Sequence, residues 1–229
     1  MKIASWNVNS LKVRLRHVLD WLESAEPDVL ALQETKLTDD KFPDAEIQEL
    51  GYNAVHSGQK TYNGVALISK DPATDIRFEG PRLAEGGKRV LIATIGGIRI
   101  VNLYVVNGQS VGSEKYTYKL FWLDHIIDEL RNELATNEQL VALGDFNIAP
   151  QDCDVHDPAA WHESILCSRE ERAKLEALLS IGLADTYRLF SQPEDSFSWW
   201  DYRQGAFRRN RGLRIDLVLA STPLVERCT

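Results

Sequence analysis

The chain has 229 residues, 44% of them hydrophobic and 26% charged, and a formal net charge of −8 at pH 7. This composition is ordinary for a globular protein and argues mildly against a general nucleic-acid binder. No apolar run approaches the roughly 18 residues of a membrane span, and a strand, not a basic and apolar leader, is expected at the N-terminus. The three cysteines lack metal-site spacing, so we expect a reducing, cytoplasmic location.

The first half of the chain is expected to hold two helices and several strands. Apolar residues at helical spacing, with Ser10 as N-cap, predict a helix over 11–22, and a shorter helix is expected at 43–50. Gly96 and Gly97 separate two β-rich segments and are a strong hairpin signal. The extended segments expected are 2–8, 29–32, 52–56, 64–69, 75–78, 89–95 and 98–104.

The second half is expected to alternate long amphipathic helices with buried strands. Apolar residues at helical spacing predict a helix over 120–134 and another over 175–181 that ends at Gly182. The apolar runs 140–143 and 213–219 predict strands. No linker, repeat or low-complexity tract interrupts the chain, so we expect a single domain over residues 1–229 with layers of sheet and helix.

Polar residues lie at the ends of three of these strands. Asn7 lies near the end of the first strand, Glu34 follows the second, and Asp145 and Asn147 follow the run 140–143. Hard oxygen ligands of this kind suit Mg²⁺ or Mn²⁺. The residues alone leave alternatives open, because Glu34 could simply pair with Lys36, and Asp and Asn both favour turns.

Six motifs that include these residues resemble, in order and spacing, those of the exonuclease III family of DNA-repair nucleases. The resemblance runs along the whole chain and is carried by residues 6–9, 32–36, 58–60, 64–66, 144–147 and 212–216. It implies an α/β (α+β) fold, namely a four-layer αββα sandwich of two packed mixed sheets with helices outside. The family's final strands are absent from the sequence as given.

The resemblance also implies roles for the polar residues. The metal site would be lined by Asn7, Glu34, Asp145 and Asn147, with Glu34 and Asp145 close enough to share one cation. Asp145 would orient and deprotonate a water molecule, and the Asn147 carboxamide would donate to a phosphoryl oxygen. Tyr104 would place its phenol near the scissile phosphate, although from the residues alone it is an ordinary strand aromatic.

Substrate contacts are implied in the same way. Asn107 would contact the phosphate, while Trp199, Leu213 and Ile215 would form an apolar pocket, at the rim of the cleft that holds Asp145, for a sugar that lacks its base. The alternative for Trp199 is a place in the core.

The chain departs from the family in one motif. The family's Ser-Asp-His motif is missing, and none of the five histidines lies in that context. Asp216 resembles the aspartate that orients the family's catalytic histidine, so its role would be idle here. We therefore expect a C-terminally incomplete form with impaired nuclease activity and reduced stability.

Five arginines lie within twelve residues, interleaved with Tyr202 and Phe207, and they are Arg203, Arg208, Arg209, Arg211 and Arg214. This segment could track phosphates, or it could be a solvated loop whose charges balance nearby acids.

The function expected from the resemblance is a Mg²⁺- or Mn²⁺-dependent DNA phosphodiesterase of base-excision repair. Its partner would be double-stranded DNA with abasic sites or damaged 3′ ends, and it would act as a monomer without a membrane. The alternatives are a non-catalytic nucleic-acid-binding or regulatory relative, or a small-molecule phosphatase of the same fold.

Overall fold

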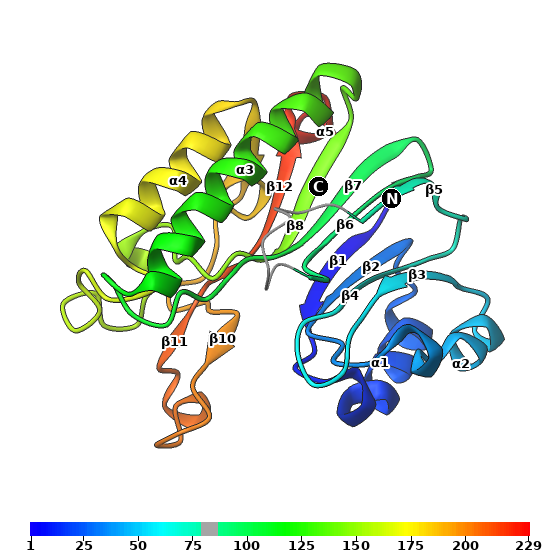
Figure 1. Cartoon of the computed structure of the whole chain (residues 1–229), viewed down its shortest axis with the longest axis horizontal. Coiled ribbons are helices and arrows are strands. Elements are labelled where there is room, and N and C mark those ends of the chain that lie inside the picture. Colours follow the sequence, from blue (N-terminus) through cyan, green and yellow to red (C-terminus); the bar gives the residue numbers. More distant parts are fainter. Residues whose placement is uncertain (79–86) are drawn as a thin grey trace. The chain divides into compact units, whose positions relative to one another are not determined.

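The computed structural model describes residues 1–78 and 87–229 and divides the chain into two compact units (Figure 1). Unit 1 comprises Met1–Tyr104 and Gln139–Asp145, and unit 2 comprises Val105–Glu138 and Phe146–Thr229. No helix in the described part of the chain is long and apolar enough to cross a membrane. The expectation of a single domain over 1–229 stays a prediction.

The first sheet of unit 1 has four strands in the order β1-β2-β4-β3. Its strands are β1 (Ile3–Asn7), β2 (Val29–Gln33), β3 (Asn53–Ser57) and β4 (Val65–Ser69). β1 and β2 run parallel, and helix α1 (Leu11–Ala25) makes the crossover that parallel strands require. The 3-10 turn η1 (Asp39–Lys41) precedes helix α2 (Asp44–Glu49).

Helices α1 and α2 cover one face of this sheet, as Figure 1 shows. Val18 and Leu22 of α1 and Ile47 of α2 are buried in one cluster with Leu30 and Leu32 of β2. Side chains alternate along a strand, so the neighbouring positions of β2 face the other way, toward the second sheet of the unit.

The second set of strands in unit 1 packs on that other face. Its order is β5-β6-β7-β8, with β5 (Thr74–Arg77), β6 (Val90–Ile95), β7 (Ile98–Tyr104) and β8 (Leu140–Asp145). The hairpin between β6 and β7 confirms the Gly96-Gly97 prediction. The fully buried Asn102 of β7 joins the two sheets, because its Nδ2 donates to the backbone oxygens of Leu32 (3.0 Å) and Ala66 (2.9 Å).

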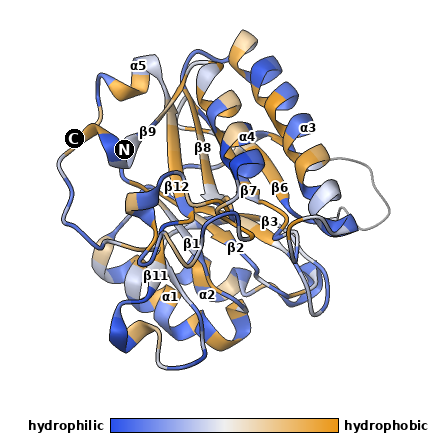
Figure 2. Ribbon diagram, turned by 90° about the vertical axis from the view of Figure 1, so that its left-hand side faces the viewer, coloured by the Kyte–Doolittle hydropathy of each residue, from blue (hydrophilic) through white to orange (hydrophobic). Residues whose placement is uncertain are grey.

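Unit 2 is built around two helices, α3 (Glu114–Thr136) and α4 (Arg169–Ser180), which pack against each other. Ser113 caps α3 and Ser168 caps α4. Figure 2 shows the alternating polar and apolar colouring of amphipathic helices on α3 and α4. The remaining elements are η2 (Asp152–Asp154), β9 (Leu183–Asp185), η3 (Thr186–Leu189), β10 (Trp199–Trp200), η4 (Phe207–Arg209), β11 (Gly212–Leu213), β12 (Asp216–Ser221) and α5 (Thr222–Val225).

The strand expected over 213–219 is interrupted. β11 ends at Leu213 and pairs with β10, whereas β12 begins at Asp216 and pairs with β9. Between them, the backbone N–H of Arg214 donates to Asp154 and that of Ile215 donates to the Ser198 hydroxyl, at 2.9 and 3.0 Å. These bonds to loops replace a continuous ladder, which the apolar pattern could not reveal.

Candidate active site

Three of the predicted site residues meet in unit 1. Asn7 ends β1, Glu34 directly follows β2, and Asp145 ends β8. The Asn7 Nδ2 group donates to Glu34 Oε1 at 2.9 Å and to Asp145 Oδ2 at 2.8 Å. Because β1 and β2 are parallel, their carboxyl ends lie at the same edge of the sheet. Two carboxylates therefore converge on a single amide nitrogen.

The neighbours of Glu34 keep its carboxylate charged. Burial by itself would raise the pKa of Glu34, but hydrogen bonds from Lys36, Asn7 and Tyr104 and the Lys36 charge outweigh burial and lower it. Lys36 Nζ lies 2.8 Å from Glu34 Oε2 and also donates to the side-chain oxygen of Asn9. Glu34 thus pairs with Lys36, which was the alternative to a metal-ligand role. The same side chain also accepts a hydrogen bond from Asn7.

Tyr104 lies beside these carboxylates as the last residue of β7, opposite Asp145 in the parallel pairing with β8. Burial raises the pKa of the phenol, and the negative charges of Glu34 and Asp145 raise it further, while Arg89 opposes them. The Arg89 guanidinium stacks over the Tyr104 ring at 4.4 Å from the centroid. The phenol therefore stays protonated at neutral pH and can act as a hydrogen-bond donor.

The oxygen donors of this cluster fit a divalent cation such as Mg²⁺. In the described part of the chain, no group combines three or more His, Cys, Asp or Glu residues into a metal-binding set. Mg²⁺, however, is commonly held by one or two carboxylates and keeps several waters, so Glu34 and Asp145 suffice. The Asn7 Oδ1 atom accepts the Asn9 backbone N–H at 3.0 Å, which directs the amide nitrogen toward both carboxylates. The ligand roles of Asn7, Glu34, Asp145 and Asn147 all stay predictions.

Two further predicted residues meet in unit 2. Asn107 Nδ2 donates to Asn147 Oδ1 at 3.1 Å, and Asn147 Nδ2 donates to the Val105 carbonyl at 3.0 Å. Asn147 is buried and adopts a left-handed backbone conformation with φ of 50°. The left-handed backbone agrees with the interpretation of Asn147 as a turn residue. In this conformation the Asn147 carboxamide points toward Asn107.

Sequence reasoning missed the residues that hold these two asparagines. Lys119 of α3 donates to the backbone oxygens of Asn147 (2.7 Å) and Asn107 (3.2 Å) and forms an ion pair with Glu171 of α4. A signal was available for each, because Lys119 falls on the apolar stripe of its helix, three residues before Trp122. Glu171 completes the Ser-x-x-Glu capping box that begins at Ser168.

The three residues of the predicted apolar pocket cluster together in unit 2. Trp199 pairs with Leu213 across the β10–β11 hairpin, and the half-buried Trp199 packs on a cluster that contains Leu213 and Ile215. Leu213 and Ile215 are themselves buried, and the backbone oxygen of Ile215 accepts the Phe146 N–H at 2.9 Å. This hydrogen bond connects the pocket residues directly to the segment that carries Asn147.

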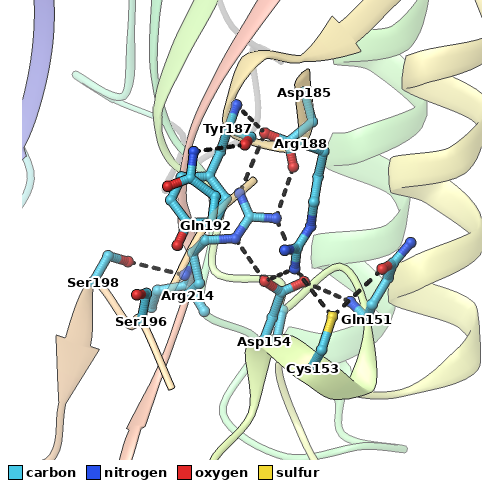
Figure 3. Close-up of polar contacts among 12 residues, drawn as sticks. Gln151, Cys153, Asp154, Asp185, Tyr187, Arg188, Gln192, Ser196, Ser198 and Arg214 are labelled. Atoms are coloured by element: carbon cyan, nitrogen blue, oxygen red, sulfur yellow. Dashed lines mark hydrogen bonds and ion pairs between the residues drawn. The ribbon is translucent and has the colours of Figure 1, made fainter. Parts of the chain in front are cut away.

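Asp216 begins β12 next to this cluster, and its backbone N–H donates to the Ser198 hydroxyl at 3.0 Å. Arg214 lies between Leu213 and Ile215 in the chain and is buried, unlike the other arginines of this segment. Its guanidinium lies between Asp154, at 2.6 Å from Nε, and Asp185, at 2.7 Å from Nη2 (Figure 3). The segment is thus divided, with Arg214 balancing acids and the other four arginines exposed to solvent.

The chain belongs to the Endonuclease/Exonuclease/phosphatase family, whose model matches residues 4–229. It is 36% identical to exodeoxyribonuclease III of Haemophilus influenzae over 241 aligned residues, which cover 100% of this chain and 90% of that protein. The structure is similar to the 3′ phosphatase NExo from Neisseria bound to a product DNA hairpin, with 45% identity, a TM-score of 0.96, and coverage of 99% and 88% of the two chains. It is also similar to an AP endonuclease from Archaeoglobus fulgidus, with 38% identity, a TM-score of 0.95, and coverage of 100% and 90%.

These similarities confirm the predicted family, the fold class of two mixed sheets with helices outside, and the enzyme class of a nuclease-type hydrolase. Nucleases of this family depend on a divalent metal ion.

Proposed function

We propose that the chain is a Mg²⁺- or Mn²⁺-dependent DNA phosphodiesterase of base-excision repair, acting as a cytoplasmic monomer of one domain. Its substrate would be duplex DNA with abasic sites or damaged 3′ ends. The observation that carries the proposal is the convergence of the Glu34 and Asp145 carboxylates on the Asn7 amide nitrogen, at 2.9 and 2.8 Å. Relatives named as an exodeoxyribonuclease, an AP endonuclease and a DNA-bound 3′ phosphatase support the choice of substrate.

Glu34 and Asp145, with Asn7 beside them, are the residues that would hold the cation. When bound, the cation would supply positive charge against the negative charge of the phosphate. Lys36 neutralises the far oxygen of Glu34, and the Glu34 pKa is already lowered, so the carboxylate needs no deprotonation before it binds.

The remaining chemistry is assigned to the polar side chains around the carboxylates and to the asparagine pair. Asp145 would orient and deprotonate the attacking water. The protonated phenol of Tyr104 and the carboxamides of Asn107 and Asn147 would donate to phosphate oxygens, where charge develops during the reaction. Donors held by hydrogen bonds before substrate arrives need no reorganisation in the transition state, and Asn147 meets this condition through Val105.

The apolar cluster of unit 2 is assigned to the sugar. Trp199 is half-buried, so part of its ring is accessible to a ligand, and it packs on the buried side chains of Leu213 and Ile215. A sugar that lacks its base offers an apolar face, and an aromatic platform suits such a face. Asp216, whose backbone N–H donates to the Ser198 hydroxyl, keeps the idle role expected from the missing Ser-Asp-His motif.

The metal assignment predicts a specific loss in Glu34→Ala. Calorimetric titration with Mn²⁺ should show binding weakened by about 10-fold or more, since even groups that only support a metal ligand commonly contribute 10–100-fold. Cleavage of a duplex with one abasic site, with enzyme in excess so that slow rates are measured, should fall in parallel. Glu23→Ala removes an exposed glutamate of α1 and is the matched control.

Equal Mn²⁺ affinity in Glu34→Ala and the parent would remove Glu34 from the site. DNA binding by the parent without any cleavage under these conditions would favour the non-catalytic alternative over the phosphodiesterase.

The exposed arginines of the β10–β11 loop predict a salt effect. Affinity for duplex DNA should fall steeply with salt concentration, and the Arg208→Ala/Arg209→Ala variant should reduce the slope of log K against log salt by up to about 1.8, for two phosphate contacts. The control Lys12→Ala/Arg16→Ala removes the same charge from exposed positions on α1. If the slope changes equally in both double variants, Arg208 and Arg209 make no specific phosphate contacts and belong to a solvated loop.

A further inference from the structure

The buried ion pair between Lys119 and Glu171 is the least expected feature of unit 2. Both side chains have no exposed surface, although one residue lies on α3 and the other on α4. A charged pair without solvent gains little net stability, because the attraction of the charges is offset by their desolvation. Apolar residues of similar volume would hold the two helices together equally well, so the pair calls for a reason other than packing.

The contacts of Lys119 point to that reason. Its ammonium donates to three acceptors, namely Glu171 and the backbone oxygens of Asn107 and Asn147. These two asparagines lie 40 positions apart in the chain, and their side chains are joined by one hydrogen bond of 3.1 Å. Only a long donor with several N–H bonds can reach both backbone oxygens from the helix, and lysine meets this requirement.

Glu171 is held in turn by several donors. Its Oε1 accepts the Leu166 N–H at 3.1 Å, and its Oε2 accepts the N–H and the hydroxyl of Ser168 at 3.1 and 2.7 Å. The Ser168 hydroxyl also lies 2.7 Å from the Tyr116 hydroxyl of α3. These donors hold the Glu171 carboxylate at the N-terminus of α4 while it pairs with Lys119.

We infer that Lys119 and Glu171 are positioning residues, which fix the Asn107 and Asn147 backbones so that their carboxamides meet a phosphate. The inference rests on the proposed function, which assigns phosphate contacts to those carboxamides. Lys119 touches only the backbone of the two asparagines in these contacts and acts through them. The α4 N-terminus, the ion pair and the asparagine pair thus form one continuous hydrogen-bonded chain within unit 2.

The test separates positioning from stability. Lys119→Met and Glu171→Gln each leave one buried charge without its partner and should lower the free energy of unfolding. The double variant Lys119→Met/Glu171→Gln removes both charges and should regain most of that stability. If the pair positions the asparagines, the double variant should still bind a duplex with a 3′-phosphate about 10-fold more weakly than the parent, and the same loss is expected for Asn147→Ala, which removes one donor to the phosphate. Anisotropy in EDTA measures this affinity without turnover.

A second readout follows the asparagines directly. The side-chain carboxamide resonances of Asn107 and Asn147 in ¹⁵N spectra should shift or broaden in the double variant, whereas those of the exposed Asn210 should not. Parent-like affinity and parent-like resonances in a refolded double variant would overturn the inference and leave a structural role. If the parent fails to bind the duplex, the proposed function fails, and the resonances still decide the positioning role.

A milder variant covers the case in which the double variant does not fold. Ser168→Ala removes the hydroxyl bond to Glu171 without changing any charge and touches neither asparagine. A shift of the Asn107 and Asn147 resonances in Ser168→Ala supports transmission through the ion pair, and unchanged resonances overturn it.

Discussion

Replacement of Gly144 by alanine is expected to lower the free energy of unfolding by about 3 kcal/mol or more. The residue has a φ of +138°, which L side chains rarely adopt, and such strain costs roughly 1–3 kcal/mol. An added Cβ would also lie 2.0 Å from the Leu103 backbone oxygen on the neighbouring strand β7. This atom belongs to a paired parallel ladder and cannot rotate away, so overpacking adds roughly 1–3 kcal/mol.

Gly182→Ala is the matched control, because Gly182 has a φ of +112° but nothing within 4 Å of an added Cβ. Urea denaturation of both variants should show the larger loss for Gly144→Ala, with the difference reporting the clash alone. Equal losses would mean that β7 and β8 separate easily at this point. Since Gly144 directly precedes Asp145, such a separation would also displace the carboxylate that meets Asn7.

Most of the strands and helices follow from apolar periodicity in the sequence. The expected helix 11–22 is observed as Leu11–Ala25, and the helix expected over 120–134 is observed as Glu114–Thr136. The earlier start of α3 follows from its Ser113 cap, because Glu114 and Lys115 at the beginning of the helix give no apolar signal. The break between β11 and β12 was not predictable, since it depends on bonds to Asp154 and Ser198, which are distant in sequence.

The identities of the site residues could be predicted from the sequence, but the orientations and partners of their side chains could not. Polar side chains after buried strands indicated that Asn7, Glu34 and Asp145 would meet, and the structure brings them together. The direction of the Asn7 amide could not be predicted, because it depends on a hydrogen bond from the Asn9 backbone. Likewise, the apolar stripe of α3 could have marked Lys119 as a buried charge, but its partners become visible only once α3 lies beside α4.

The buried position of Arg214 predicts that it contributes to stability, unlike its exposed neighbours. Arg214→Met should lower the free energy of unfolding by about 3–5 kcal/mol, because the substitution leaves two carboxylates without their shared partner. The Asp154 side chain is 1% exposed and that of Asp185 is 10% exposed, so water cannot replace the guanidinium at Asp154. Hydrogen bonds and the charges of both acids outweigh burial and raise the pKa of Arg214, as expected for a cation held by two anions.

Arg208→Met is the control for this prediction, since the same change at an exposed tip position should alter stability by no more than about 0.5 kcal/mol. Thermal and urea unfolding of both variants measure the contrast. A parent-like stability in Arg214→Met would show that Arg188, which also pairs with Asp154, neutralises that carboxylate alone (Figure 3). DNA affinity should rank the two variants in the opposite order from stability. Arg208→Met should weaken binding without loss of stability, whereas Arg214→Met should disturb binding only through Leu213 and Ile215, the apolar neighbours that its ion pairs hold in place.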